Sequence, residues 1–313
     1  MRSRLAPSPT GHLHVGNART FLLTWLHVRA AGGSLLLRID DLDTPRVRQE
    51  AIAGLLEDLR WLGLAWDEPE AVLRQSQRAG LYAAAAERLR AQGLAYPCTC
   101  TRKEVEEAAS APHGAEGPRY PGTCRGRWST LAEAEAATGK PACLRLVVAA
   151  GAERFTDLLY GPQAVDVAAE TGDFVIHRNS GVAAYQLATV VDDAASGADL
   201  VLRASDLLPS TARQRLLQRA LGLPLPATLH LPLVLGEDGR RLAKRHGDTA
   251  LATLRAQGWT PEELLGRLAW TAGLARHGEA VSLATLLSRY DPARLGSEAV
   301  VFRAREWQRA PGA

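Results

Sequence analysis

The apolar positions in the first fifth of the chain change between two periods. Residues 2–6 read as a short strand, and the apolar residues that follow Gly16 recur with a helical period. Three consecutive leucines within 34–39 predict a buried strand, and the spacing over 52–59 predicts a second amphipathic helix. The order strand, helix, strand, helix predicts a right-handed parallel βαβ unit.

This regular pattern breaks between about residues 97 and 140, where cysteines and a loop rich in Pro and Gly occur together. We interpret the break as an insertion. Beyond it, the chain predicts strands at 144–148, 174–176 and 200–203 and helices at 184–194 and 211–221. The predicted parts are an α/β catalytic domain in two halves (1–96 and 173–240), an insertion (97–172), and a charged loop with a short helical C-terminal region (241–313).

Composition narrows the class of protein without naming an activity. Hydrophobic residues make up 46% of the chain, as in ordinary soluble domains. The net charge of +3 does not by itself argue for a nucleic-acid coat. No run approaches the roughly 18 apolar residues of a membrane span, and the N-terminus has no apolar signal core. We therefore expect a cytoplasmic protein that contacts no membrane.

The turn between the first strand and the first helix, residues 7–17, carries two histidines and two glycines. Ligands of open α/β sheets bind at the carboxyl ends of the strands, and a helix N-terminus attracts phosphate. There Gly16 would let an adenine ring approach the backbone, and His14 would donate to phosphate oxygens. Because a single His-x-Gly is more often a plain turn, this interpretation depends on the rest of the chain.

Several motifs follow one another in the order of a known family. Arg4-x-Ala-Pro-Ser-Pro-Thr-Gly-x-Leu-His-Val-Gly and the segment 37–43 resemble the start of the catalytic domain of the glutamyl-tRNA synthetases, which are class I aminoacyl-tRNA synthetases. His14-Val-Gly-Asn17 matches their HIGH signature, and Arg241-Leu-Ala-Lys-Arg245 resembles their KMSKS loop. Residues 184–193 and 201–206 resemble segments that line the amino-acid pocket. The likeness spans about 2–260 and implies a Rossmann-type parallel sheet.

The layout resembles one branch of this family. Only about 70 residues follow the Arg241–Arg245 loop, where glutamyl-tRNA synthetases carry an anticodon-binding domain. That layout and the Cys98-x-Cys100 and Tyr120-x-x-x-Cys124 motifs resemble the glutamyl-queuosine tRNA(Asp) synthetases. The resemblance implies a ligase that activates L-glutamate with ATP and Mg²⁺ without tRNA. It would then transfer glutamate to the queuosine base at the wobble position of tRNA(Asp). We expect it to act as a monomer.

The resemblance also implies roles for individual side chains. Lys244 would steady the transferring phosphates as a mobile point charge and act with His14 in catalysis. Arg4 and Arg203 would pair with carboxylates, and Asp40 would meet the ammonium group. By sequence alone the arginines could form ordinary ion pairs. The implied ATP site comprises His12, His14, Gly16, Asn17 and Lys244, and the implied glutamate site comprises Arg4, Ala6, Ser8, Asp40, Tyr185 and Arg203.

The cysteine cluster predicts one structural zinc ion per chain. Cys98, Cys100 and Cys124 offer three thiolates, and closed zinc sites take four ligands. Spacing alone nominates His113 as the fourth ligand, whereas the resemblance nominates Tyr120, which we favour.

Three departures from the family pattern leave room for a weak enzyme or for a different amino acid. Asp40 stands where the family has Glu, Ala204 where it has Gly, and Ala243 where its loop has Ser. The alternatives are a truncated glutamyl-tRNA synthetase that charges a tRNA 3′ end, another nucleotidyltransferase with the same turn, and a non-catalytic paralogue that binds tRNA or glutamate.

Overall fold

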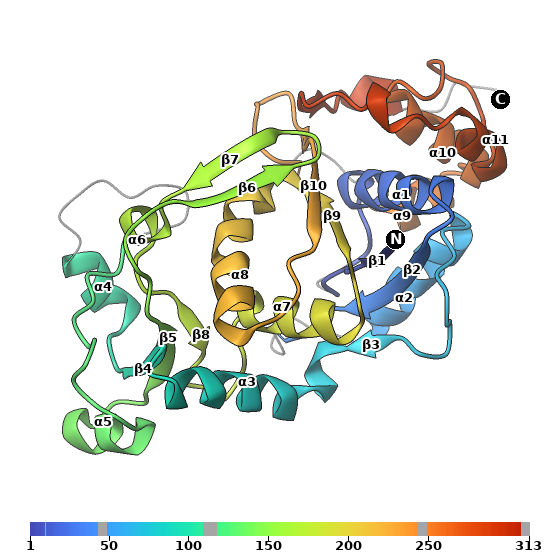
Figure 1. Ribbon diagram of the computed structural model, residues 1–313. Helices are drawn as coiled ribbons and strands as arrows, with labels where there is room; N and C mark the ends of the chain where they lie inside the picture. Colours follow the sequence, from blue (N-terminus) through green and yellow to red (C-terminus); the bar gives the residue numbers. More distant parts are fainter. Residues whose placement is uncertain (10, 43–48, 109–117, 243–248, 308–313) are drawn as a thin grey trace.

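A computed structural model describes residues 1–9, 11–42, 49–108, 118–242 and 249–307 (Figure 1). The strands are β1 (Arg2–Leu5), β2 (Ser34–Ile39), β3 (Leu73–Arg74), β4 (Ala95–Cys98), β5 (Cys143–Leu146), β6 (Glu153–Asp157), β7 (Gly161–Val165), β8 (Val175–His177), β9 (Leu200–Ala204), β10 (Ala227–Leu231), β11 (Val234–Leu235) and β12 (Val300–Val301). The helices are α1 (Val15–Ala30), α2 (Gln49–Trp61), α3 (Ala79–Ala91), α4 (Arg102–Ala108), α5 (Leu131–Thr138), α6 (Val167–Glu170), α7 (Tyr185–Ala195), α8 (Leu208–Leu221), α9 (Leu251–Ala256), α10 (Pro261–Trp270) and α11 (Leu283–Arg289).

The core of the molecule contains two mainly parallel sheets that meet edge to edge. In the first, β2 lies between β1 and β3, and both pairings are parallel. In the second, the order is β7-β6-β10-β9, with only β7 antiparallel. The amide of Asp199 donates to the carbonyl of Arg2 at 3.0 Å, which joins the edges at β1 and β9. The predicted parallel βαβ unit and α/β fold class are confirmed.

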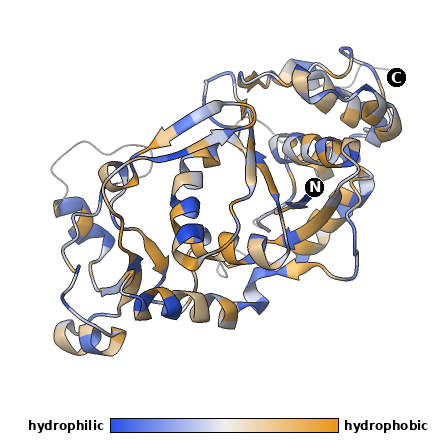
Figure 2. Ribbon diagram, in the orientation of Figure 1, coloured by the Kyte–Doolittle hydropathy of each residue, from blue (hydrophilic) through white to orange (hydrophobic). Residues whose placement is uncertain are grey.

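Helix α1 is apolar on more than one side because other elements pack against two of its sides. Leu22, Leu26 and Val28 are fully buried, and the helix contacts the strands β1 and β2 as well as the C-terminal helices α10 and α11. Figure 2 shows β2 largely in the hydrophobic colours, as expected for a strand buried on both faces. This packing fixes the N-terminal end of α1 beside the carboxyl ends of β1 and β2.

An antiparallel sheet with the order β4-β5-β8 lies around the predicted insertion and extends beyond its limits. Hydrogen-bonded pairing crosses both predicted boundaries of the insertion. Ala95 of β4 pairs with Leu146 of β5 across the first boundary. Across the second, β6 pairs with β10 and β5 pairs with β8. The four-part division of the chain therefore stays a prediction, because the sheets do not separate at its limits. Within the described residues, no helix is long and apolar enough to cross a membrane.

Candidate active site and metal centre

A cleft of about 470 Å³ opens at the carboxyl ends of β1, β2 and β9. The order of the strands reverses between β1 and β9, and such a switch point is where open α/β sheets bind their ligands. The predicted ligand residues that line the cleft are Arg4, Ala6, Ser8, His12, His14, Asn17, Asp40, Tyr185 and Arg203.

The backbone explains why residues so distant in sequence meet here. Ala6 and Ser8 directly follow β1, Asp40 follows β2, and Arg203 lies near the end of β9. Because parallel strands end at the same edge of a sheet, these positions converge. Tyr185 is the first residue of α7 and reaches the cleft from the helix N-terminus.

Gly16 lies next to the cleft but does not line it. A Cβ atom at this position would come within 3.1 Å of the Cε1 atom of His14. The glycine therefore leaves room for the imidazole ring, which occupies the N-cap position of α1.

The hydrogen bonds of His14 define its proton position. Its Nδ1 atom accepts from the backbone amides of Gly16 and Asn17, at 3.1 and 3.4 Å. Burial, followed by the positive charge of Arg241, lowers the pKa of His14 to about 4. The imidazole is therefore neutral at pH 7 and carries its proton on Nε2, which leaves one N–H donor for a ligand.

The described residues that flank 243–248 contact the cleft on one side and the start of α1 on the other. Arg241 lines the cleft, and the carbonyl of Thr249 accepts from the amide of Val15 at 3.0 Å. Lys244, the predicted catalytic lysine, and Ala243 lie outside the described residues.

Arg4, Arg38 and Asp40, which line the cleft, form a buried charge network with Asp193. Arg4 donates to Asp193 from Nε at 2.8 Å, and Arg38 donates to Asp193 from Nη1 at 2.6 Å. Arg38 also donates two hydrogen bonds to the carboxylate of Asp40, from Nε at 2.6 Å and from Nη2 at 3.2 Å. These four charges balance, so Arg4 has an acid partner in the absence of any ligand.

The pKa values of the two aspartates move in opposite directions in this network. Burial raises the pKa of Asp40 more than the neighbouring Arg38 lowers it. Burial also disfavours the charged form of Asp193, but Arg4 and Arg38 together bring its pKa below the ordinary value. Arg38 and Asp193 are not among the predicted ligands. The sequence pattern that could have indicated them is a charged residue in a largely apolar run. Arg38 lies in the run 35–39, and Asp193 ends the run 187–193.

Arg203 has a different environment from Arg4. Only 6% of its surface is exposed, and its partners are neutral. Nε donates to Nε2 of His230 at 3.0 Å, and the two terminal nitrogens donate to Gln214 and Thr211, both at 2.8 Å. In the described part of the chain, no carboxylate pairs with Arg203. Burial lowers the pKa of this guanidinium, as expected for a cation with no counter-charge in contact.

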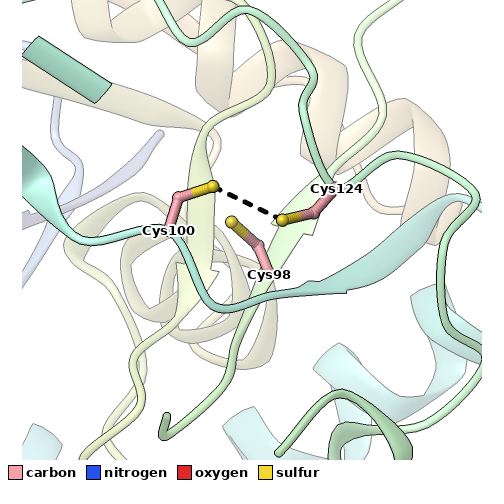
Figure 3. A group of neighbouring side chains, drawn as sticks. All are labelled: Cys98, Cys100 and Cys124. Carbon is pink, nitrogen blue, oxygen red and sulfur yellow. Dashed lines mark hydrogen bonds between the residues drawn. The ribbon is translucent and has the colours of Figure 1, made fainter. Parts of the chain in front are cut away.

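The three predicted cysteine ligands lie together in the insertion, and their sulfur atoms are all within 4.8 Å of one another (Figure 3). The Sγ atoms of Cys100 and Cys124 are 3.4 Å apart. The phenolic oxygen of Tyr120 lies 3.3 Å from Sγ of Cys98 and 3.7 Å from Sγ of Cys100. Three sulfurs and one oxygen can hold a metal ion in this arrangement.

The surroundings of Tyr120 orient its oxygen toward the cysteines. The amide of Cys124 donates to this oxygen at 2.9 Å. Arg145 stacks on the ring, 3.8 Å from its centre, and donates to Sγ of Cys98 at 3.2 Å. A cation beside the cluster favours thiolates over thiols. His113, the other candidate fourth ligand, lies outside the described residues.

Comparison with known proteins identifies the family. Residues 1–289 match the model of the tRNA synthetases class I (E and Q), catalytic domain. The chain belongs to this family. It is similar to the glutamyl-Q tRNA(Asp) synthetases of Symbiobacterium thermophilum, with 50% identity over 95% of this chain and 94% of the relative, and of Nocardia farcinica, with 49% identity over 94% and 91%.

Longer relatives in the same family are covered over a smaller share of their own length. The chain is 41% identical to a glutamate–tRNA ligase of Nitrosococcus oceani and covers 68% of it. A crystal structure of a glutamate tRNA ligase from Elizabethkingia meningosepticum in complex with its amino acid superposes with a TM-score of 0.81, at 26% identity, and covers 98% of this chain and 68% of that one. The predicted resemblance to the glutamyl-queuosine branch and the assignment as a synthetase, a ligase, are confirmed.

Proposed function

We propose that this class I synthetase activates L-glutamate with ATP, without tRNA, and transfers the glutamyl group to the queuosine base of tRNA(Asp). The observation that carries the proposal is the 50% identity to a glutamyl-Q tRNA(Asp) synthetase across 94% of that relative. Because its proposed substrate is a tRNA, we propose that the enzyme works in the cytoplasm. We also propose that it acts as a monomer.

Glutamate would occupy the end of the cleft that the buried charges form. Arg203 would bind a carboxylate, since its charge lacks an acid partner among the described residues. Asp40 would accept from the α-ammonium group. Its shorter side chain still presents a carboxylate at the cleft. Arg4, Tyr185 and the Ala6–Ser8 segment would complete the contacts.

ATP would bind at the N-terminal end of α1. The free Nε2–H of His14 would donate to a phosphate oxygen and stabilise the charge that develops there. His12, Gly16 and Asn17 would shape the nucleotide site, and Lys244 would approach the phosphates from its loop. Mg²⁺ would accompany the ATP. A glutamate oxygen would then bond to the α-phosphorus as the bond to pyrophosphate breaks.

The metal held by the insertion would be zinc. Its proposed ligands are Cys98, Cys100, Cys124 and the oxygen of Tyr120, in the tetrahedral number that structural zinc sites use. Its role would be to hold β4 and the following loop in place, because these ligands are separated by up to 26 residues of chain.

The decisive test is glutamate-dependent ATP–pyrophosphate exchange without tRNA, together with transfer of labelled glutamate to tRNA with and without queuosine. Exchange without tRNA and transfer only to queuosine-bearing tRNA would support the proposal. Transfer to the 3′ end of tRNA that lacks queuosine would instead favour a glutamate–tRNA ligase, and no exchange with any amino acid would indicate a binding protein.

A variant pair tests the assignment of Arg203 in the same assay. Arg203→Ala should raise the KM for glutamate about 100-fold or more, since two charge-assisted hydrogen bonds are worth about 3 kcal/mol or more in total. The KM for ATP should stay within about threefold. Arg154→Ala, an exposed position on β6, is the matched control and should change neither value. Equal losses for ATP and glutamate in Arg203→Ala would contradict the assignment.

A further inference from the structure

A fully buried pair, Asp157 and His230, lies directly behind Arg203. His230 is on β10 beside β9, and Asp157 ends β6 on its other side. Both side chains have no exposed surface, and Nδ1 of His230 is 2.6 Å from Oδ2 of Asp157. The other carboxylate oxygen accepts the amides of Leu159 and Tyr160, at 3.1 and 3.0 Å.

These contacts fix which nitrogen of His230 carries the proton. The neighbours that contact Asp157 are donors, so the carboxylate stays ionised and takes the Nδ1–H of the imidazole. The hydrogen bond from His230 helps to hold the pKa of Asp157 low against the opposing effect of burial. Burial in turn lowers the pKa of His230. The imidazole is therefore neutral, and its Nε2 is an acceptor aimed at the Nε–H of Arg203, 3.0 Å away.

Arg4 and Arg203, the two arginines predicted to bind carboxylates, are consequently held in different ways. Arg4 is fixed by the carboxylate of Asp193, which cancels its charge. Arg203 is fixed by three neutral acceptors, on His230, Gln214 and Thr211. The imidazole ring of His230 stands between Arg203 and the carboxylate of Asp157.

We propose that the Asp157–His230 pair is a positioning device that orients Arg203 without neutralising it, and so makes the site select glutamate over glutamine. The inference rests on the proposed function. The α-carboxylate of the substrate must face ATP to react, so the buried guanidinium is left for the side-chain carboxylate. An amide at that place carries no charge to balance Arg203, whereas a carboxylate does. His230 is thus a positioning residue that touches no substrate itself.

Two substitutions at position 230 separate its two hydrogen bonds, the one to Asp157 and the one from Arg203. His230→Asn can keep a donor near the Nδ1 position, toward Asp157, but loses the acceptor for Arg203. His230→Gln can place its oxygen near the Nε2 position and keep that acceptor. In tRNA-free exchange, His230→Asn should raise the KM for glutamate about tenfold and lower the preference for glutamate over glutamine by a similar factor. His230→Gln should recover most of both, and the KM for ATP should hardly change.

A third variant tests the charge argument without removing the buried pair. Gln214→Glu is nearly isosteric and places a carboxylate where Arg203 now donates at 2.8 Å. The ion pair should preserve folding, checked by thermal melting, while it raises the KM for glutamate at least tenfold and reduces discrimination against glutamine.

The outcomes distinguish this inference from the proposed function. If the unmodified protein shows no glutamate-dependent exchange, the proposed function and the inference both fail. Exchange by the unmodified protein, with an unchanged KM for glutamate and unchanged discrimination in Gln214→Glu, overturns the inference alone. Equal effects of His230→Asn and His230→Gln on glutamate and ATP would show a purely structural role and also overturn it.

Discussion

Replacement of Asp193 by Asn isolates the buried charge network of the cleft. Asp193 is 3% exposed and accepts from both Arg4 and Arg38. Asparagine has almost the same volume, so the change removes one negative charge and little packing. The two buried guanidinium groups of Arg4 and Arg38 then have one fewer negative charge beside them. Asp40 would be the main remaining acid partner of Arg38.

The cost can be worked out from this geometry. Removal of one partner from a buried ion pair destabilises a protein by about 3–5 kcal/mol. At about 2–4 °C per kcal/mol for a chain of this size class, the melting temperature should fall by roughly 10 °C at pH 7.

The same loss should depend on pH in a defined direction. Because the folded-state pKa of Asp193 is depressed, its contribution is fully present above the pKa of an unfolded aspartate, about 3.9, and is lost as the pH falls through the lower folded value. The difference in melting temperature between the parent and Asp193→Asn should therefore be constant above about pH 5 and shrink below about pH 4.

Thermal melting followed by circular dichroism across pH 3–8 measures both effects. Glu87→Gln is the control, because it removes a carboxylate from an ion pair with Arg90 that is exposed on α3. That control should melt within about 1 °C of the parent. A shift as small as this for Asp193→Asn at pH 7, or a difference that grows below pH 4, would refute the reasoning.

Three further predictions concern other parts of the molecule. Tyr120→Phe should lower the bound zinc measured by atomic absorption, whereas Tyr290→Phe, in the C-terminal region, should not; zinc in Tyr120→Phe equal to that of the unmodified protein would exclude the phenolic ligand. Ring-nitrogen NMR of His14 should show a neutral imidazole with the proton on Nε2 down to about pH 5, and protonation at pH 6 would contradict its buried environment. Gly266→Ala places a methyl group into a backbone carbonyl of the following loop and should cost at least about 2 kcal/mol in chemical denaturation, while Gly80→Ala, which meets nothing, should be neutral or slightly stabilising.

The sequence alone determined the elements whose stability is local or periodic. The apolar spacing located β1, α1, β2 and α2, because a buried face repeats with the period of its own helix or strand. The motif order indicated the family, and the rule that parallel strands end at one edge explains why Ala6, Asp40 and Arg203 meet in one cleft. The short β3 and the pairing of β6 with β10 left no comparable periodic signal.

Only the tertiary structure decided how the charges of the cleft are compensated. Arg4 and Arg203 look equivalent in sequence, yet one meets Asp193, 189 residues further along the chain, and the other meets neutral groups from β10 and α8. Likewise, the sequence spacing did not place the phenolic oxygen of Tyr120, which the packed insertion brings to 3.3 Å from Sγ of Cys98. An electrostatic interaction depends on separations of a few ångströms between side chains from distant strands, and those separations exist only once the sheets have packed.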